Sequence, residues 1–196
     1  MKVMDASELY DPEFRKLIKS KQTVIIPVGS LEQHGAHLPI TTDSDIVTEI
    51  ASRLGKKCGF VVFPTVSYGV SFEHEPLFNT SIDEKKFVLF LTDICYSILK
   101  NVDHIIILNG HHGNIQALGR LEEGLVRFSG QEGRDRIKFF NYWEFMKHEF
   151  DHAGFVETSI MLAISDKVKM KKAKKGLITK GLSEKEIQRI KELSTK

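Results

Sequence analysis

The chain has 196 residues, of which 41% are hydrophobic and 28% are charged, and its formal net charge is +2 at pH 7. These values are ordinary for one compact soluble domain. No run approaches the roughly 18 apolar residues of a membrane span, and the first residues lack the apolar core of a signal peptide. We therefore expect a cytoplasmic protein without a membrane partner. The two cysteines, Cys58 and Cys95, cannot form a disulfide framework, and we expect both to be small buried apolar residues.

The predicted elements alternate between strands and helices. Residues 5–19 have apolar side chains at mixed spacing, and Pro12 suits a first helical turn. Ser81 followed by Glu84 predicts a capping box at a helix start. In chain order the later elements are the strand 23–28, the helix 46–54, the strand 60–63, the loop 65–78, the helix 81–101, the strand 104–108, the helix 114–125, the strand 137–140 and the helix 156–164. This order predicts an α/β fold with a mainly parallel central sheet and helices on both faces.

A polar stretch with metal-binding residue types directly follows the first long strand. It runs from Ser30 to Asp45 and contains Glu32, His34 and Asp43. Open α/β sheets place their ligand crevice just past the carboxyl ends of the strands, which is where these residues are released. We interpret the stretch as half of a metal site.

Two further stretches supply ligands of the same kind. Asn109-Gly110-His111-His112-Gly113-Asn114 follows the strand 104–108, and residues 151–159 add His152 and Glu157. Carboxylate and imidazole ligands from several loops suit zinc, iron or manganese. No cysteine lies near these stretches in the sequence, which argues against thiolate chemistry.

Together the three stretches resemble the creatininase (creatinine amidohydrolase) family. The resembling motifs are Leu-Glu-Gln-His-Gly with an Asp nine residues beyond the His, Asn-Gly-His with a following Asn, and His-x-Gly-x-x-Glu-Thr-Ser, in that order. The resemblance covers about residues 23–163. It implies a creatininase-like fold, two divalent metal ions per chain (zinc, iron or manganese) and a homo-oligomer.

The resemblance also implies roles for individual residues. Asp43 would bridge the two ions, Glu32 and His111 would complete the first, and His34 would bind the second. Creatininase has a Glu two residues after the His of Asn-Gly-His, which serves the second metal, whereas this chain has Gly113. The missing ligand must come from elsewhere, and Glu157 is the natural candidate. The alternative for Glu157 is a carboxylate favoured by the dipole at a helix start.

Each of the other candidates also has a plainer alternative. Glu32 could complete a turn, Asp43 could cap the following helix and His34 could be a polar loop residue. His152 aligns with the histidine proposed in creatininase to donate a proton to the leaving nitrogen, and an imidazole pKa near 6.5 suits that task. We treat His152 and Glu157 as the catalytic candidates. A lone histidine is more often structural, but His152 lies within a motif.

The remaining histidines of these loops give a weaker signal. His37, His74 and His112 are candidates for contacts with the substrate or with the metal ligands. Glu73 and His74 form an acidic and histidine pair in a loop, and such pairs are usually solvated. The chain has no phosphate-binding Gly-rich loop and no Gly-x-Ser-x-Gly motif, which argues against a nucleotide-binding enzyme and a serine hydrolase.

The C-terminal stretch differs in composition from the rest. Residues 167–196 hold eleven Lys or Arg against three Glu, so we divide the chain into a hydrolase domain at 1–166 and a Lys-rich extension at 167–196. Ser183 and Glu186 form a possible capping box, so the extension is expected to end in a helix. We favour a solvated basic face over a nucleic-acid-binding role, although the charge would suit a phosphorylated substrate.

These observations predict a metal-dependent amidohydrolase. It would cleave a non-peptide C–N bond (amide, formamide, or cyclic amide or amidine) in a small polar molecule through a metal-activated water. One alternative is a formamidopyrimidine ribonucleotide deformylase of flavin or deazaflavin synthesis. The other is a non-catalytic binding protein that keeps the fold.

Overall fold

The computed structural model describes residues 4–18, 22–174, 176 and 181–194. At its centre is a five-stranded sheet in which every pair of neighbouring strands is parallel. In spatial order the strands are β1 (Met4–Asp5), β3 (Val61–Val62), β2 (Thr23–Val28), β4 (His104–Asn109) and β5 (Ile137–Asn141). The predicted parallel α/β sheet is confirmed. β1 was not predicted, because two residues are too few to show a period.

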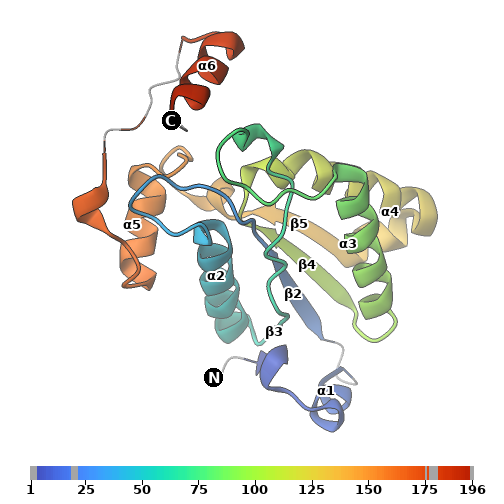
Figure 1. The fold of residues 1–196 in the computed structure, drawn as a ribbon. Helices are drawn as coiled ribbons and strands as arrows, with labels where there is room; N and C mark the ends of the chain where they lie inside the picture. Colours follow the sequence, from blue (N-terminus) through green and yellow to red (C-terminus); the bar gives the residue numbers. More distant parts are fainter. Residues whose placement is uncertain (1–3, 19–21, 175, 177–180, 195–196) are drawn as a thin grey trace.

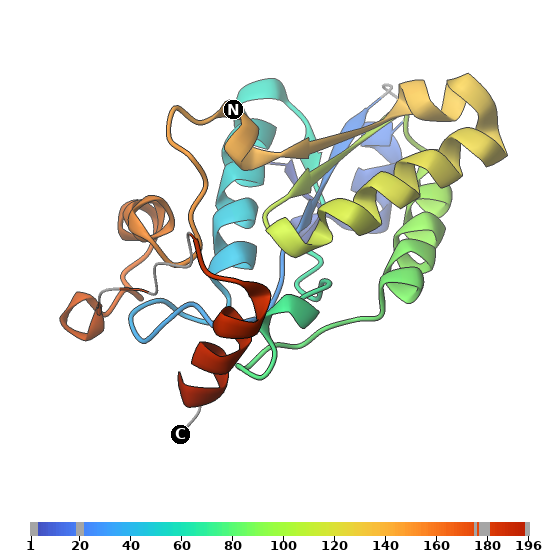
Figure 2. The same cartoon turned by 90° about the horizontal axis from the view of Figure 1, so that it is seen from above.

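Helices cover both faces of the sheet, as predicted (Figure 1). The helices are α1 (Asp11–Ile18), α2 (Thr42–Cys58), α3 (Glu84–Leu99), α4 (Ile115–Arg136), α5 (Phe155–Ile164) and α6 (Glu184–Ser194). Seen from above, α2 and α5 lie on one side of the strands and α3 and α4 lie on the other (Figure 2). In the part of the chain that the structure describes, no helix combines the length and the apolar character needed to cross a membrane.

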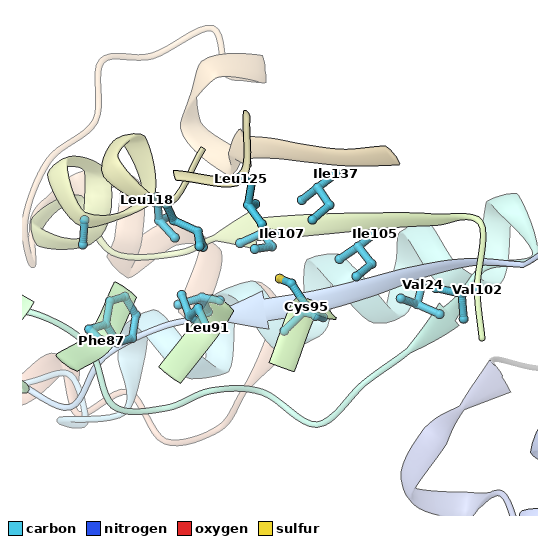
Figure 3. Packing of buried hydrophobic residues seen from close by; sticks show 14 of the residues in the cluster. Val24, Phe87, Leu91, Cys95, Val102, Ile105, Ile107, Leu118, Leu125 and Ile137 are labelled. Carbon is cyan, nitrogen blue, oxygen red and sulfur yellow. The ribbon is translucent and has the colours of Figure 1, made fainter. Parts of the chain in front are cut away.

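Alternate residues of the central strands enter two separate cores. Ile105 and Ile107 of β4 belong to the cluster that contains residues of α3 and α4, whereas Ile106 and Leu108 pack in the cluster with α2 and α5. Figure 3 shows the first cluster, in which Cys95 of α3 lies among the aliphatic side chains. Both faces of β4 are therefore buried, which explains its continuous apolar run.

Two local predictions were wrong. Cys58 is exposed at the last residue of α2, whereas Cys95 is buried as expected. The helix α3 is capped by Asp83, whose side chain accepts the Lys86 N–H, and not by Ser81. Ser81 instead lies in an extended bridge with Gly69 and accepts the Ser71 N–H at 2.8 Å. Pairing with a distant segment therefore overrides the local capping pattern at Ser81.

The basic C-terminal stretch begins against the domain. The Lys167 ammonium lies 2.9 Å from Asp45, and the Lys169 N–H donates to the carbonyl of His37 at 2.8 Å. Further along, α6 stands clear of the central sheet (Figure 1). The N–H of Ser183 donates to Glu186 at 2.8 Å, and the Glu186 N–H donates back to the Ser183 hydroxyl at 3.4 Å, which is the capping-box pattern.

Candidate metal centre

The first two polar stretches meet because β2 and β4 end at the same level. The two strands pair in register from Thr23 opposite His104 to Val28 opposite Asn109. The Gly110 N–H continues this pairing by donating to the Val28 carbonyl at 2.8 Å. The residues that follow the two strands therefore lie close together at the carboxyl edge of the sheet.

Asp43 lies between the polar side chains that follow the two strands, in the first turn of α2. Its Oδ1 is 3.1 Å from His34 Nε2, and its Oδ2 is 3.0 Å from His111 Nδ1. The side chain is only 2% exposed, and the Ser30 hydroxyl donates to Oδ2 at 3.0 Å. Burial alone would raise the pKa of Asp43, but its hydrogen bonds to His111 and His34 hold that pKa well below its usual range. Asp43 is thus an ionised carboxylate, and each of its two oxygens contacts a different histidine.

Backbone groups fix the ring of His111. Its Nε2 donates to the Val70 carbonyl at 2.9 Å, which leaves Nδ1 as the nitrogen that faces Asp43. The Asn109 side chain accepts the His111 N–H and donates to the His111 carbonyl, so the loop itself is also held. Burial lowers the pKa of His111, but the carboxylates of Asp43 and Glu73 outweigh it and raise the pKa to about 10 in the metal-free protein.

Two buried glutamates complete the polar cluster. Glu32 is 1% exposed and Glu157 is 0% exposed. Among the described residues, neither carboxylate oxygen of Glu32 has a hydrogen-bond partner. The same is true of Oε1 of Glu157. Glu157 Oε2 accepts the Ala153 N–H at 2.6 Å and lies 3.6 Å from His34 Nε2. Burial raises the pKa of Glu157. Carboxylates buried in this way are costly unless a cation accompanies them.

The spacing of these atoms fits divalent metal ions. Four ligands at about 2.0–2.1 Å around a tetrahedral ion lie roughly 3.3–3.4 Å apart. The contacts of His34 Nε2 and His111 Nδ1 with the carboxylates of Asp43 and Glu157 range from 3.0 to 3.6 Å. Among the residues that the structure describes, three sets of side chains each offer ligand atoms that lie within 4.8 Å of one another. They are Glu32 with Asp43 and His111, His34 with His152 and Glu157, and Glu32 with His74 and His152. All five predicted metal-binding residues lie in this one cluster.

His152 lies at the rim of the cluster. Its side chain is 33% exposed, its ring centroid is 4.5 Å from that of His34, and its Nε2 is 3.0 Å from the side-chain nitrogen of Gln33. Burial, with a smaller contribution from the charge of the neighbouring His34, lowers the pKa of His152 to about 4. The imidazole is therefore neutral at neutral pH in the metal-free protein.

The loop 65–81 brings two further residues, Glu73 and His74, to the cluster. His74 Nε2 is 2.9 Å from Glu32 Oε1, and its side chain is 13% exposed, so the prediction of a solvated pair was wrong for His74. Glu73 is about half exposed and lies 3.5 Å from His111 Nε2. The loop returns to the first motif because Glu32 forms a bridge with Asn79. The interpretation of His74 as a residue that contacts the metal ligands therefore fits the structure better than that of a solvated pair.

A cavity of about 270 Å³ opens onto the cluster. It is lined by Glu32, Asp43, Glu73, His74, His111, His112, Phe150 and His152. The ring of His112 stacks on that of Phe150, with centroids 5.8 Å apart and planes 16° apart, and so forms part of an aromatic wall. His37 does not belong to this lining, and its Nε2 contacts the Thr158 hydroxyl at 2.9 Å.

Gly113 cannot be replaced by a ligand side chain without rearrangement. A Cβ atom at this position would collide with the Glu73 carboxylate, the Val70 carbonyl and the His111 ring. The neighbouring segment therefore fills the space that a side chain at position 113 would need.

Comparisons with known proteins agree with this architecture. The profile of the creatininase family, described as creatinine amidohydrolase, matches residues 7–195. A mycofactocin precursor peptide peptidase of Mycolicibacterium smegmatis is 38% identical over 77% of this chain and 61% of its own length. A 2-amino-5-formylamino-6-ribosylaminopyrimidin-4(3H)-one 5'-monophosphate deformylase of Methanocaldococcus infernus is 31% identical over 76% of this chain and 64% of its own length.

A solved creatininase variant of the Zn–Zn type superimposes with a TM-score of 0.80 and 25% identity, over 90% of this chain and 78% of that one. The chain spans about three fifths of the length of these two curated relatives. The profile match over nearly the whole chain carries the assignment. The chain belongs to the creatininase family.

Proposed function

We propose that the protein is a metal-dependent hydrolase that cleaves a C–N bond of the amide type in a small polar molecule. The observation that carries this proposal is Asp43, a buried ionised carboxylate whose two oxygens face two different histidines. A carboxylate in this position suits two ions that share it. Both carboxylate oxygens of Glu32, and Oε1 of Glu157, lack hydrogen-bond partners in the described part of the chain, which supports the presence of cations.

The ligand sets follow from the contacts. We assign Glu32, Asp43 and His111 to the first ion, and His34, Asp43 and Glu157 to the second. Nitrogen and carboxylate ligands suit zinc or manganese as well as iron. The related creatininase of the Zn–Zn type favours zinc and a count of two.

We assign the proton transfers of the reaction to two residues of the chain, Glu157 and His152. Bound divalent ions supply Lewis acidity and a water of lowered pKa. Glu157 is the carboxylate that we expect to take the proton that the attacking water releases. His152 donates to the leaving nitrogen from the cavity rim. The ring of His152 is neutral, so it must gain a proton before it can give one. One ligand atom of His152 lies within 4.8 Å of one of Glu157, so the proton taken by Glu157 can pass to His152, which then donates it to the leaving nitrogen.

The substrate class has two candidates. A formamide or cyclic amide fits a cavity of about 270 Å³ and the deformylase relative. A short peptide is favoured by the 38% identity to a peptide peptidase. Parallel assays with N-formyl amines, cyclic amides and short unblocked peptides separate these candidates, because each class releases a different product.

Other properties extend the proposal to the whole chain. We propose that residues 1–166 form the hydrolase unit, that residues 167–196 are a basic extension, and that the protein is a cytoplasmic homo-oligomer. The contacts of Lys167 and Lys169 support an extension that starts on the hydrolase unit. Light scattering of the full chain measures the oligomeric state. Kinetics after neutralising the lysines at 167–175 test whether the extension assists a phosphorylated substrate.

The decisive experiment is elemental analysis of the full chain beside Asp43→Ala. The expected result is close to two metal ions per chain in the parent and a large loss in the variant, since Asp43 is shared. Glu123→Ala, which removes a carboxylate from α4 outside the cluster, should keep both ions. A parent chain without specific metal would refute the hydrolase proposal and favour a binding protein.

A further inference from the structure

Gln33 connects two histidines that line the cavity. Its side-chain nitrogen lies 3.0 Å from Nε2 of His152 and 3.3 Å from Nδ1 of His74. Its side-chain oxygen accepts the Gly35 N–H at 3.1 Å. A backbone N–H can only donate, so this contact identifies the oxygen of the amide and directs its NH₂ group at the two rings.

This orientation determines where the two rings carry their protons. Each hydrogen of the Gln33 amide faces one ring nitrogen, which must accept it with a lone pair. In a neutral imidazole one nitrogen accepts and the other carries the proton. The proton therefore lies on Nδ1 of His152 and on Nε2 of His74. Both of these nitrogens lie near Glu32 Oε1, at 3.8 Å and 2.9 Å respectively, but neither is hydrogen-bonded to it.

The same arrangement shows whether Glu32, His74 and His152 form a further metal site or a group of N–H donors. By spacing alone, Glu32, His74 and His152 could hold a further cation. A ring nitrogen that carries a proton cannot bind a metal, however, and the nitrogens without protons are occupied by Gln33. The two rings form a group of N–H donors, which lies beside the proposed ions and is not a third metal position.

We propose that Gln33 is a positioning residue that holds His74 and His152 as neutral N–H donors facing the cavity. His74 thereby becomes a second imidazole that can hydrogen-bond to the substrate, beside His152. Preorganised donors of this kind stabilise negative charge that develops on a substrate during hydrolysis. The role toward substrate rests on the proposed function, whereas the proton positions do not.

The direct test is nitrogen-15 NMR of the eight histidines in the full chain, recorded with and without Zn²⁺. The ring-nitrogen shifts report which nitrogen carries the proton, and spectra of His74→Asn and His152→Asn assign the two rings. We expect protonated Nδ1 and unprotonated Nε2 in His152, and the reverse in His74. The opposite arrangement in either ring, or loss of both protonated nitrogens on zinc binding, would overturn the proposal.

Gln33→Met tests whether Gln33 is the cause. This side chain has a similar length but no donor, so both rings should lose their single tautomer, and kcat should fall by about 10-fold or more with a smaller change in KM. Gln116→Met, on the exposed face of α4, is the matched control and should change neither quantity. Unchanged tautomers in Gln33→Met would refute the assignment. If no amide is hydrolysed by the parent, the proposed function fails while the NMR result still decides the role of Gln33.

Discussion

The two halves of the candidate metal centre are built in different ways. The half with Glu32, Asp43 and His111 follows two paired central strands, and all three side chains are buried. The half with His34 and Glu157 depends on the segment 151–157, which joins the cluster from α5. The first half is therefore an extension of the sheet, whereas the second is completed by a separate segment.

The segment 151–157 has its own supports. The Asp151 carboxylate accepts the N–H groups of Val156 and Glu157 and so caps the start of α5. Ala153 has a φ of 50°, in the left-handed region, and its N–H donates to Glu157 Oε2. A non-glycine residue in that region is held there by its surroundings. The second half thus relies on a strained turn, which suggests that it is easier to disrupt than the first.

Removing one glutamate from each half gives the largest expected effect. Glu32→Gln should lose the first ion and Glu157→Gln the second, and each should lower kcat by at least about 100-fold, because even indirect partners of metal ligands cost 10–100-fold. Metal titration should show one remaining ion of different affinity in each variant. Glu13→Gln, on exposed α1, is the control. Full metal content in Glu157→Gln would contradict its assignment as a ligand.

His152 separates a catalytic role from a ligand role in the second half. His152→Ala should keep both ions and lower kcat by about 100-fold, the smaller end of the range for a lost proton donor. Elemental analysis and single-turnover kinetics measure the two quantities on the same sample. His148→Ala, which alters a histidine outside the cavity lining, should retain activity. Near-full turnover in His152→Ala would refute the catalytic role.

The two halves also differ in what the sequence could predict. The sequence predicted that Glu32, His34, Asp43 and His111 lie together because they follow strand ends at characteristic spacing, and it added Glu157 through its motif. His74 was only one of three candidates for contacts around the site, because its place is set by the pairing of Glu32 with Asn79, which no local pattern records. The contacts of Gln33 depend on the same loop. The local sequence pattern therefore predicts the polar residues that follow the strand ends. The residues that line the cavity from the loop 65–81 are placed by long-range backbone pairing, which the local pattern does not record.

Metal removal should affect the second half more than the first. A ligand at 100 times its Kd stabilises the fold by about 2.7 kcal/mol, which corresponds to a fall in Tm of about 5–10 °C on chelation, since each kcal/mol shifts Tm by roughly 2–4 °C in a domain of this size. Hydrogen exchange should show increased opening at residues 151–157, with β2 and β4 still protected. Equal exchange at both places would mean that the halves are supported alike.

The smallest expected effect concerns the support of the shared ligand. Ser30→Ala removes the hydroxyl that donates to Asp43 Oδ2 at 3.0 Å, the oxygen on the first half. We expect metal affinity to fall by about 10-fold, mainly at the first ion, because Oδ1 keeps its contact with His34. Ser44→Ala is a demanding control, because the Ser44 hydroxyl donates to the Ser30 carbonyl at 3.0 Å and, among the described residues, has no bond to Asp43. This variant should leave both affinities unchanged. Equal loss at both ions in Ser30→Ala would show that the carboxylate moves as a unit, so that the two halves are coupled through Asp43 and cannot be tuned separately.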